Sequence, residues 1–304
     1  MSQKKLGRVP SRPLVSIVMP TLNQGRFIKQ SIESVLTQDY SELELVVADG
    51  GSSDNTHGLL TDMSTADPRL RWSSQRDTGP AEALNRALRG VQGTIVGWLN
   101  SDDLYTPGAI QSAVNAFAAQ PDWIMTYGHG EHVDEEGTVL APYPTLRPDG
   151  PIERFSNGCF ICQPTVFFQR SMYLLLGALD NNLKASFDFD YWLRAFRAFQ
   201  DRIGFIDAVQ AQSRLHDACI TKTARRTVAL EGVRVVARHM GTAPTHWFVT
   251  YIEELLHQAP PEGDGHIEEQ LRTALDEVKD CFEPNDLRAL QEQLRYILPN
   301  DGNR

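Results

Sequence analysis

Short apolar segments that alternate with helical patterns are the feature that most constrains the fold of this chain. Three segments rich in β-branched residues, at 14–19, 43–48 and 94–99, have the length and composition of buried parallel strands. Apolar residues at helical spacing occur between them at 27–36 and 81–88. This order predicts an α/β fold with a mostly parallel central sheet and helices on both faces.

Acidic residues follow the predicted strands at the points where the strands end. Asp49 follows the second apolar segment, Asp77 comes just beyond a short predicted strand at 69–73, and Asp102 follows the segment at 94–99. Ligands of open parallel sheets gather at the carboxyl ends of the strands. The three residues therefore predict a binding site at this edge of the sheet.

Charge and hydropathy exclude several classes of protein. The formal net charge of −10 and the pI of about 5.3 argue against a nucleic-acid partner. An acidic protein still binds a diphosphate when a divalent cation lies between the two negative groups. Residues 1–12 are basic and polar, so we expect a flexible N-terminus without a secretory signal. With no apolar run of membrane-spanning length, we expect a cytoplasmic protein without a transmembrane segment.

The second half of the sequence has a different pattern. Segments at 123–127, 164–169 and 203–209 predict mixed or antiparallel additions to the sheet, and 187–199 is typical of a helix. Four prolines lie in 141–157, which predicts a long surface loop there.

The C-terminal region is predicted to be helical from about residue 223 onward. The apolar residues at helical spacing are Ile267, Leu271, Ala274, Leu275, Val278, Phe282, Leu287, Leu290, Leu294 and Leu298. The apolar stripes of these helices need a covering surface, either the rest of the chain or a second copy in a homodimer. We therefore expect an α/β domain at 13–222 and a helical region at 223–304.

Two pairs of acids are candidates for chemistry, and each has a structural alternative. Asp102 and Asp103 provide the hard oxygen ligands that Mg²⁺ and Mn²⁺ prefer, but they could equally cap the helix that follows. Asp188 and Asp190 begin a predicted helix, where acids are stabilised by the helix dipole or serve as a general base. An unpaired acidic pair beside an apolar strand is costly, which favours a metal at Asp102 and Asp103. For Asp188 and Asp190 the residues alone leave both alternatives open.

Several ordered motifs carry a resemblance to a known family. The segment VSIVMPTLNQGRFIKQSIESVLTQDYSELELVVADGGSSDNT, followed by DTGPAEALNRAL and TIVGWLNSDDLY, resembles the family 2 glycosyltransferases of the GT-A fold, which is Rossmann-like. The resemblance covers residues 13–222. It implies an enzyme of bacterial polysaccharide or glycan biosynthesis that moves a sugar from a nucleotide sugar, with a UDP-sugar as the expected donor. The implied acceptor is a glycan, a lipid-linked molecule or a protein.

The resemblance also implies roles for individual residues. Those implied to bind the nucleotide are Pro20, Thr21, Asn23, Asp49, Asp77, Ser101 and Asp102. Asp102 and Asp103 are implied to bind a Mn²⁺ or Mg²⁺ ion. His216, in the run Arg-Leu-His-Asp, resembles a histidine that reaches the metal or the diphosphate. Asp188, in FDFDYWLR, stands at the position of the catalytic base.

Two positions depart from the family pattern. Phe187 stands where many members have a glutamate, so the base lacks its usual acidic neighbour. Asn100 replaces the first acid of many DxD motifs, which leaves Asp102 as the expected direct ligand. The implied reaction is a single in-line displacement that inverts the anomeric configuration.

Two other functions use a similar architecture. A sugar nucleotidyltransferase would carry a glycine-rich loop with basic residues after the first strand, where this chain has PTLNQG. A non-catalytic nucleotide-sugar-binding protein would have no need of a base such as Asp188. Both remain alternatives to the transferase.

Overall fold

A computed structural model of the chain describes residues 12–257 and 265–297. The expected flexible N-terminus at 1–12 lies outside the described residues except for residue 12, and so does the predicted helical position of Leu298.

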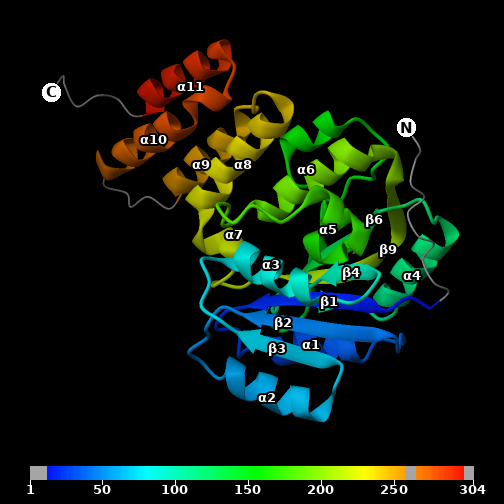
Figure 1. Ribbon diagram of the computed structural model, residues 1–304. Coiled ribbons are helices and arrows are strands. Elements are labelled where there is room, and N and C mark those ends of the chain that lie inside the picture. The colour runs from blue at the N-terminus through cyan, green and yellow to red at the C-terminus, as the bar shows by residue number, and fades with distance from the viewer. Residues whose placement is uncertain (1–11, 258–264, 298–304) are drawn as a thin grey trace. The chain divides into compact units, whose positions relative to one another are not determined.

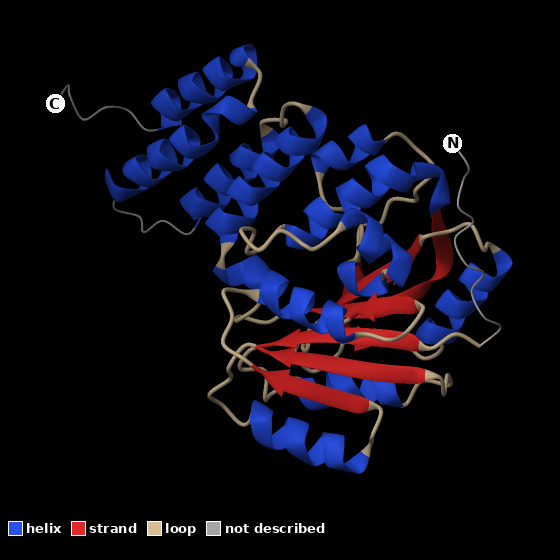
Figure 2. Ribbon diagram, in the orientation of Figure 1, coloured by secondary structure: helices blue, strands red, loops and turns tan. Residues whose placement is uncertain are grey.

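Among the described residues, nine strands form one sheet, and helices pack on both faces of its parallel half (Figures 1 and 2). The strands are β1 (Val15–Thr21), β2 (Leu43–Asp49), β3 (Leu70–Ser74), β4 (Ile95–Trp98), β5 (Leu104–Tyr105), β6 (Met125–Val133), β7 (Val139–Pro142), β8 (Phe167–Gln169) and β9 (Ile203–Arg214). The α-helices are α1 (Ile28–Leu36), α2 (Thr56–Ala66), α3 (Pro80–Gly90), α4 (Ala109–Ala119), α5 (Arg170–Leu176), α6 (Phe187–Phe199), α7 (Ile220–Thr223), α8 (Arg225–Met240), α9 (His246–His257), α10 (Gly265–Val278) and α11 (Pro284–Ile297). Short 3₁₀ helices are η1 (Ile152–Asn157), η2 (Gln163–Thr165), η3 (Gln200–Arg202) and η4 (Lys279–Cys281).

The first half of the sheet is parallel, as the sequence predicts. Its strand order is β3-β2-β1-β4, with each neighbouring pair parallel. Right-handed crossovers place α1 and α2 on one face and α3 on the other, because the chain reverses its direction of travel across the sheet after β3. Figure 1 shows α2 and α3 on opposite sides of these strands. The reversal creates a topological switch point between β1 and β4.

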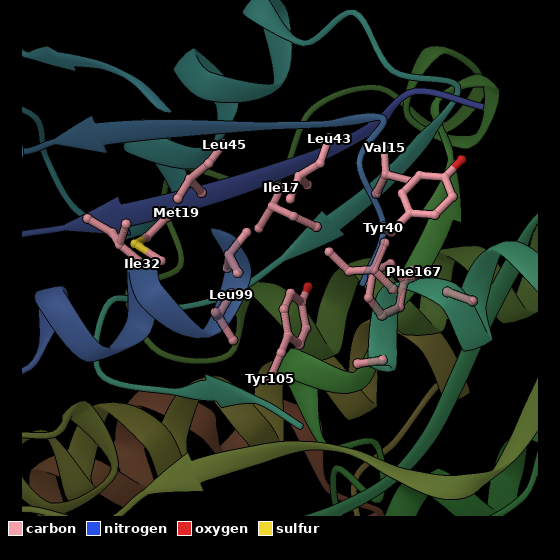
Figure 3. Packing of buried hydrophobic residues seen from close by; sticks show 14 of the residues in the cluster. Val15, Ile17, Met19, Ile32, Tyr40, Leu43, Leu45, Leu99, Tyr105 and Phe167 are labelled. Carbon is pink, nitrogen blue, oxygen red and sulfur yellow. The ribbon is translucent and has the colours of Figure 1, made fainter. Parts of the chain in front are cut away.

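Burial on both faces explains why the predicted parallel strands are apolar along their whole length. Every residue of β1 is buried, and β2 has a similar pattern. Ile28, Ile32 and Val35 of α1 lie one turn apart on a single face and are fully buried. These residues belong to a buried apolar cluster, part of which is drawn in Figure 3. Ile17 and Leu45 come from the parallel half of the sheet, and Phe167 comes from the mixed half.

The second half of the sheet is mixed, in agreement with the predicted antiparallel additions. β8 runs antiparallel to both β4 and β6, whereas β9 runs parallel to β6 and antiparallel to β5. The strand expected at 203–209 extends to Arg214, because β9 pairs along the full length of β6. The prediction of a loop at 141–157 is only partly correct. Residues 141–142 belong to β7, and residues 152–157 form η1.

The chain divides into two compact units. The first comprises Met1–Gly150 and Cys159–His216, and the second comprises Pro151–Gly158 and Asp217–Arg304. The second unit is helical, as predicted for the C-terminal region, and it also contains η1. None of the helices among residues 12–257 and 265–297 combines the length and the apolar character required to cross a bilayer.

Candidate active site

The carboxyl ends of three neighbouring parallel strands bring most of the candidate residues to one edge of the sheet. β1 ends at Thr21 and β2 ends at Asp49, and these two residues are direct partners in the register. Pro20, one position earlier, pairs with Ala48. β4 lies on the other side of β1 and leads into the loop 99–103. This edge lies at the topological switch point, where open α/β sheets bind ligands.

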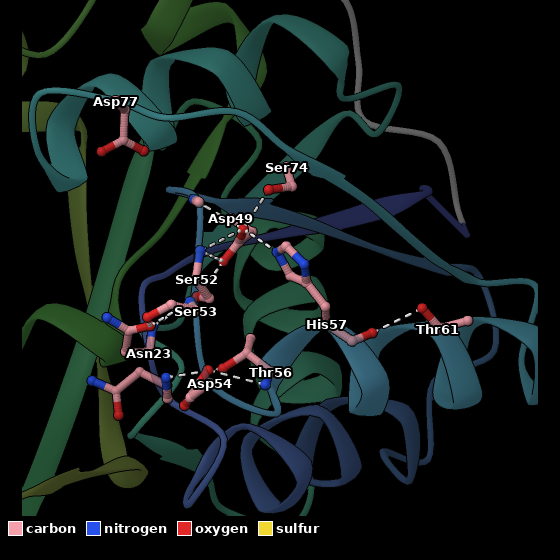
Figure 4. A network of polar contacts seen from close by, with 12 residues as sticks. Asn23, Asp49, Ser52, Ser53, Asp54, Thr56, His57, Thr61, Ser74 and Asp77 are labelled. Atoms are coloured by element: carbon pink, nitrogen blue, oxygen red, sulfur yellow. Dashed lines mark hydrogen bonds and ion pairs between the residues drawn. The ribbon is translucent and has the colours of Figure 1, made fainter.

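Asp49 is fully buried and organises the loop after β2 (Figure 4). Its Oδ2 accepts hydrogen bonds from the Gly51 N–H at 2.9 Å and the Ser74 hydroxyl at 2.6 Å, and it lies 2.7 Å from His57 Nε2. The Ser52 hydroxyl donates to Oδ1 at 2.5 Å. Burial would raise the pKa of Asp49, but the hydrogen bonds from Ser52, Ser74 and His57 lower it to about 2. Asp49 is therefore a carboxylate at neutral pH.

Asn23 joins the loop after β1 to the loop after β2. Its backbone is in the left-handed region with φ of 54°, which asparagine tolerates better than most residues. The Asn23 N–H donates to the Ser52 hydroxyl at 2.7 Å, and the Asn23 Oδ1 accepts from the Ser53 N–H at 2.8 Å. The buried Thr21 hydroxyl has no hydrogen-bond partner among the described residues. The two loops thus form one continuous polar surface.

Asp77 lies in the loop before α3, and one of its oxygens is without a hydrogen bond. Its Oδ1 accepts from the Gly79 N–H at 3.1 Å, whereas Oδ2 accepts none from the described residues and lies 3.7 Å from Arg86 Nη2. Burial raises the pKa of this carboxyl, and the Gly79 hydrogen bond and Arg86 offset that effect only in part. A buried acceptor in this state is suited to a ligand that brings an N–H or O–H donor.

Gly50 and Arg86 place Asp77 beside the loop that Asp49 organises. A Cβ atom at Gly50 would lie 2.9 Å from Asp77 Oδ2, so the backbone of the loop after β2 approaches the carboxylate closely. Arg86 also donates from Nη2 to the Asp49 carbonyl at 2.8 Å. Asp49 and Asp77 therefore belong to the same end of the candidate site.

Asp102 and His216 form a pair beyond the end of β4. Asp102 Oδ2 lies 3.0 Å from His216 Nε2, and the histidine is buried with its ring 4.7 Å from the Phe27 ring. Ser101, the residue before Asp102, is also buried. Within the described part of the chain, no group of three or more His, Cys, Asp or Glu side chains is arranged to hold a metal ion. A cation here would therefore rest on two protein ligands and the ligand's own oxygens.

Asp103 is directed toward protein groups. Its Oδ1 accepts from the Arg214 N–H at 2.9 Å, and its Oδ2 accepts from Asn100 Nδ2 at 3.2 Å. Burial raises its pKa well above the usual value, and the charge of Asp102 adds to the shift. These contacts make Asp103 a support for the loop 99–103.

Arg214 is a residue that the sequence pattern gave no reason to single out. It is buried at the end of β9, and its Nε donates to the Asp102 carbonyl at 2.8 Å while Nη2 donates to Gln30 Oε1 at 3.0 Å. Together with its N–H bond to Asp103, it fixes the loop that carries Asp102. The run Arg-Leu-His-Asp was the available signal, but it pointed to His216.

Asp188 lies in the first turn of α6, close to the end of β4. The ring of Phe187 stacks on Trp98 at 5.5 Å between centroids, which ties the start of α6 to β4. Gln163 contributes to the same junction by donating from Nε2 to the Trp98 carbonyl at 2.8 Å. Trp192 of the same helix is fully buried.

Asp188 and Asp190 differ in accessibility. Asp188 is half-buried and its Oδ1 accepts from the Phe189 N–H at 2.7 Å, whereas Asp190 is 1% exposed and lies 3.7 Å from Arg194 Nη1. Burial raises the pKa of the Cys159 thiol, and the charge of Asp188 raises it further. Of the two acids, Asp188 is the one that solvent or a substrate reaches.

This mostly parallel sheet, with acidic loops at its switch point and added C-terminal helices, defines a glycosyltransferase fold of the GT-A type. Residues 16–174, more than half of the chain, match the family described as Glycosyl transferase family 2. The chain belongs to this family and is a glycosyltransferase.

Individual relatives agree with this assignment. The chain is similar to an uncharacterized glycosyltransferase of Rickettsia prowazekii, with 29% identity over 230 residues that cover 70% of this chain and 67% of that protein. Three further relatives from Rickettsia are longer, and the chain spans 30–34% of their length.

Two solved structures share the fold. TarS residues 1–349 of S. aureus, in complex with UDP-GlcNAc, has a TM-score of 0.66 and 19% identity, covering 93% of this chain and 86% of that chain. A mannosyltransferase from Pyrobaculum calidifontis, in complex with GDP-Man and Mn²⁺, has a TM-score of 0.58 and 20% identity, covering 98% and 85%.

Proposed function

We propose that this glycosyltransferase moves a sugar from a nucleoside diphosphate sugar to a hydroxyl group of its acceptor, with inversion and with a divalent cation. The observation that carries the proposal is the Asp102–His216 pair at the end of β4, across the switch point from Asp49 and Asp77. The two groups would serve the two ends of one ligand, with the diphosphate at the pair and the nucleoside near Asp77.

The Asp102–His216 pair has the chemistry of a Mn²⁺ or Mg²⁺ site. A carboxylate oxygen and an imidazole nitrogen are suitable ligands for Mn²⁺, and the carboxylate also suits Mg²⁺. Oδ2 and Nε2 lie 3.0 Å apart and share a hydrogen bond, so a cation held by both atoms would take the place of that hydrogen bond. Asp102 and His216 would hold the ion, and Asp103 would support the loop. A bound cation would neutralise the charge of the leaving diphosphate.

The nucleotide would lie against the polar surface made by the loops after β1 and β2. Asp77 Oδ2 and the Thr21 hydroxyl lack hydrogen-bond partners among the described residues and are suited to contact the base or ribose. Asn23, Pro20 and Ser101 would line the same surface. Asp49 would act by holding the loop, because its oxygens already accept hydrogen bonds from protein groups.

Asp188 would act as the general base. It would accept the proton of the acceptor hydroxyl while that oxygen forms a bond to the anomeric carbon. The bond between the anomeric carbon and the diphosphate oxygen would break at the same time, and its electron pair would leave with the nucleoside diphosphate. Attack from the face opposite the leaving group inverts the anomeric configuration.

The donor in this proposal is a UDP-sugar, supported by the UDP-GlcNAc complex of the structurally similar TarS. GDP-sugars stay in the test, because the mannosyltransferase neighbour binds GDP-Man. The acceptor would be a glycan, a lipid-linked molecule or a protein.

The test of the base compares Asp188→Asn with Asp190→Asn. Nucleoside diphosphate release is measured with a panel of nucleotide sugars and Mn²⁺, with and without acceptor mixtures. Asp188→Asn should keep donor affinity and lower turnover by about a hundredfold, the usual effect of losing a general base. Asp190→Asn serves as the comparison, because the buried Asp190 is paired with Arg194. Normal turnover in Asp188→Asn, together with a loss of turnover in Asp190→Asn, would contradict the role of Asp188 and indicate Asp190 as the base.

A further inference from the structure

The segment 177–186, which connects α5 to α6, is attached to α3 by a buried side chain. Asn85 of α3 is 2% exposed, and its Oδ1 accepts from the Leu179 N–H at 2.9 Å. Its Nδ2 donates back to the Leu179 carbonyl at 3.0 Å and to Asn181 Oδ1 at 2.7 Å. The side chain of Asn85 therefore pairs with the segment much as a neighbouring strand would.

Lys184 forms a second attachment at the surface. Its Nζ donates to the Thr78 carbonyl at 2.8 Å and to the Asn181 carbonyl at 3.0 Å. Thr78 follows Asp77 directly, in the loop that begins α3. At Gly79 a Cβ atom would lie 3.4 Å from Lys184 Cδ, so the missing side chain leaves room for the lysine stem. Lys184 thus bonds to the backbone of the Asp77 loop.

The same segment is held to α6 at its beginning. Arg194 of α6 donates from Nη1 to the Ala178 carbonyl at 2.9 Å and from Nη2 to the Leu176 carbonyl. At its end the segment continues into α6, and Asp188 is four residues beyond Lys184. The segment therefore lies between the Asp77 loop on one side and the helix that carries Asp188 on the other.

We infer that Lys184 is a positioning residue that couples nucleotide binding at Asp77 to the placement of Asp188. A nucleotide that contacts Asp77 orders the loop 75–79, and the ammonium bonds to Thr78 and Asn181 transmit that order to the start of α6. Hydrogen bonds from an ammonium group to carbonyl oxygens are charge-assisted and stronger than neutral hydrogen bonds. They are therefore suited to connect the Asp77 loop to the segment 177–186 at the surface. This inference rests on the proposed function.

The test uses Lys184→Met, which keeps the stem beside Gly79 and removes the ammonium group. We expect its kcat to fall about tenfold and its Kd for the donor to rise about threefold, consistent with the loss of a charge-assisted hydrogen bond. Lys184→Arg should recover most of both values, because a guanidinium group also donates to two carbonyls. Lys29→Met is the matched control, since Lys29 is an exposed α1 lysine 3.9 Å from Glu33, and it should match the wild type.

A double variant separates positioning from a general structural effect. If Lys184 acts on turnover through Asp188, Lys184→Met should lower turnover little further in an Asp188→Asn background, while the threefold rise in donor Kd persists. Equal kcat and Kd in Lys184→Met and the wild type would overturn the inference, and so would an undiminished tenfold loss in the Asp188→Asn background. A wild-type chain that neither binds a nucleotide sugar nor releases a nucleoside diphosphate would overturn the proposed function along with it.

Discussion

Asp49 shows at the scale of one residue how the site depends on the fold. Its pKa of about 2 in the folded chain is below the value of about 3.9 for an unfolded chain. A lowered pKa means that the charged form of Asp49 stabilises the fold. This stabilisation is fully present at pH values above the unfolded pKa. We expect this contribution to be lost as the pH falls from about 4 to about 2.

The corresponding variant is Asp49→Asn. It should lower the free energy of unfolding by about 2 kcal/mol at pH 7, because an amide has a single acceptor oxygen and cannot accept from both Ser52 and Ser74 as the two carboxylate oxygens do. The difference from the wild type should shrink below pH 4. Urea unfolding at pH 7 and pH 3 measures both values, with the exposed Asp62→Asn on α2 as control. A difference that stays constant with pH would contradict this account of Asp49.

Single residues were predictable from the sequence where they follow a strand. Asp49 and Asp102 fall at strand ends, and their position and charge are enough to indicate a site. Arg214 was not predictable, because its bond to Asp103 spans 111 residues and arises from the pairing of β9 with β5. Gln163 was not predictable either, because its contact with Trp98 joins two distant segments.

At the scale of elements, the parallel strands were easier to predict than the antiparallel ones. β1 and β2 are buried on both faces, so their composition alone identifies them. β5 has two residues and β8 has three, which are too few to show a period. Their positions depend on partners from distant segments, and those partners are not encoded locally.

The 3₁₀ helix η1 belongs to the helical unit, although it comes much earlier in the sequence than the helices it contacts. Trp247 of α9 donates from Nε1 to the carbonyl of Ser156, 91 residues away in the sequence, at 2.6 Å, and Phe155 is 3% exposed. The Trp247 ring also lies close to Gly232 of α8, where a Cβ atom would be 2.6 Å away. The helices of this unit therefore depend on η1 as a packing partner.

A truncation tests this dependence. A chain that ends at residue 222 lacks the helices that surround η1, so Phe155 would become exposed. We expect a lower melting temperature and binding of a hydrophobic dye. In the full chain, Trp247→Phe loses the hydrogen bond to Ser156 and part of the ring that packs beside Gly232, and it should cost at least about 1 kcal/mol. If the truncated chain has the melting temperature of the full chain and binds no dye, η1 does not depend on the C-terminal helices for burial.

At the scale of the whole molecule, charge sets a condition on the proposed function. The chain carries a formal net charge of −10, and the edge of the sheet presents several carboxylates. A divalent cation would lie between these charges and the diphosphate of a bound donor. The proposed function therefore predicts that donor binding depends on a divalent cation.

Calorimetric titration of a nucleotide sugar into the full chain, with Mn²⁺ and then with a chelator, measures this dependence directly. Wild type should bind the donor at least about tenfold more tightly with Mn²⁺. Asp102→Asn should lose most of this difference, whereas Asp122→Asn, at an exposed position, should keep it. Equal donor affinity with Mn²⁺ and with chelator, or an undiminished Mn²⁺ effect in Asp102→Asn, would contradict the account.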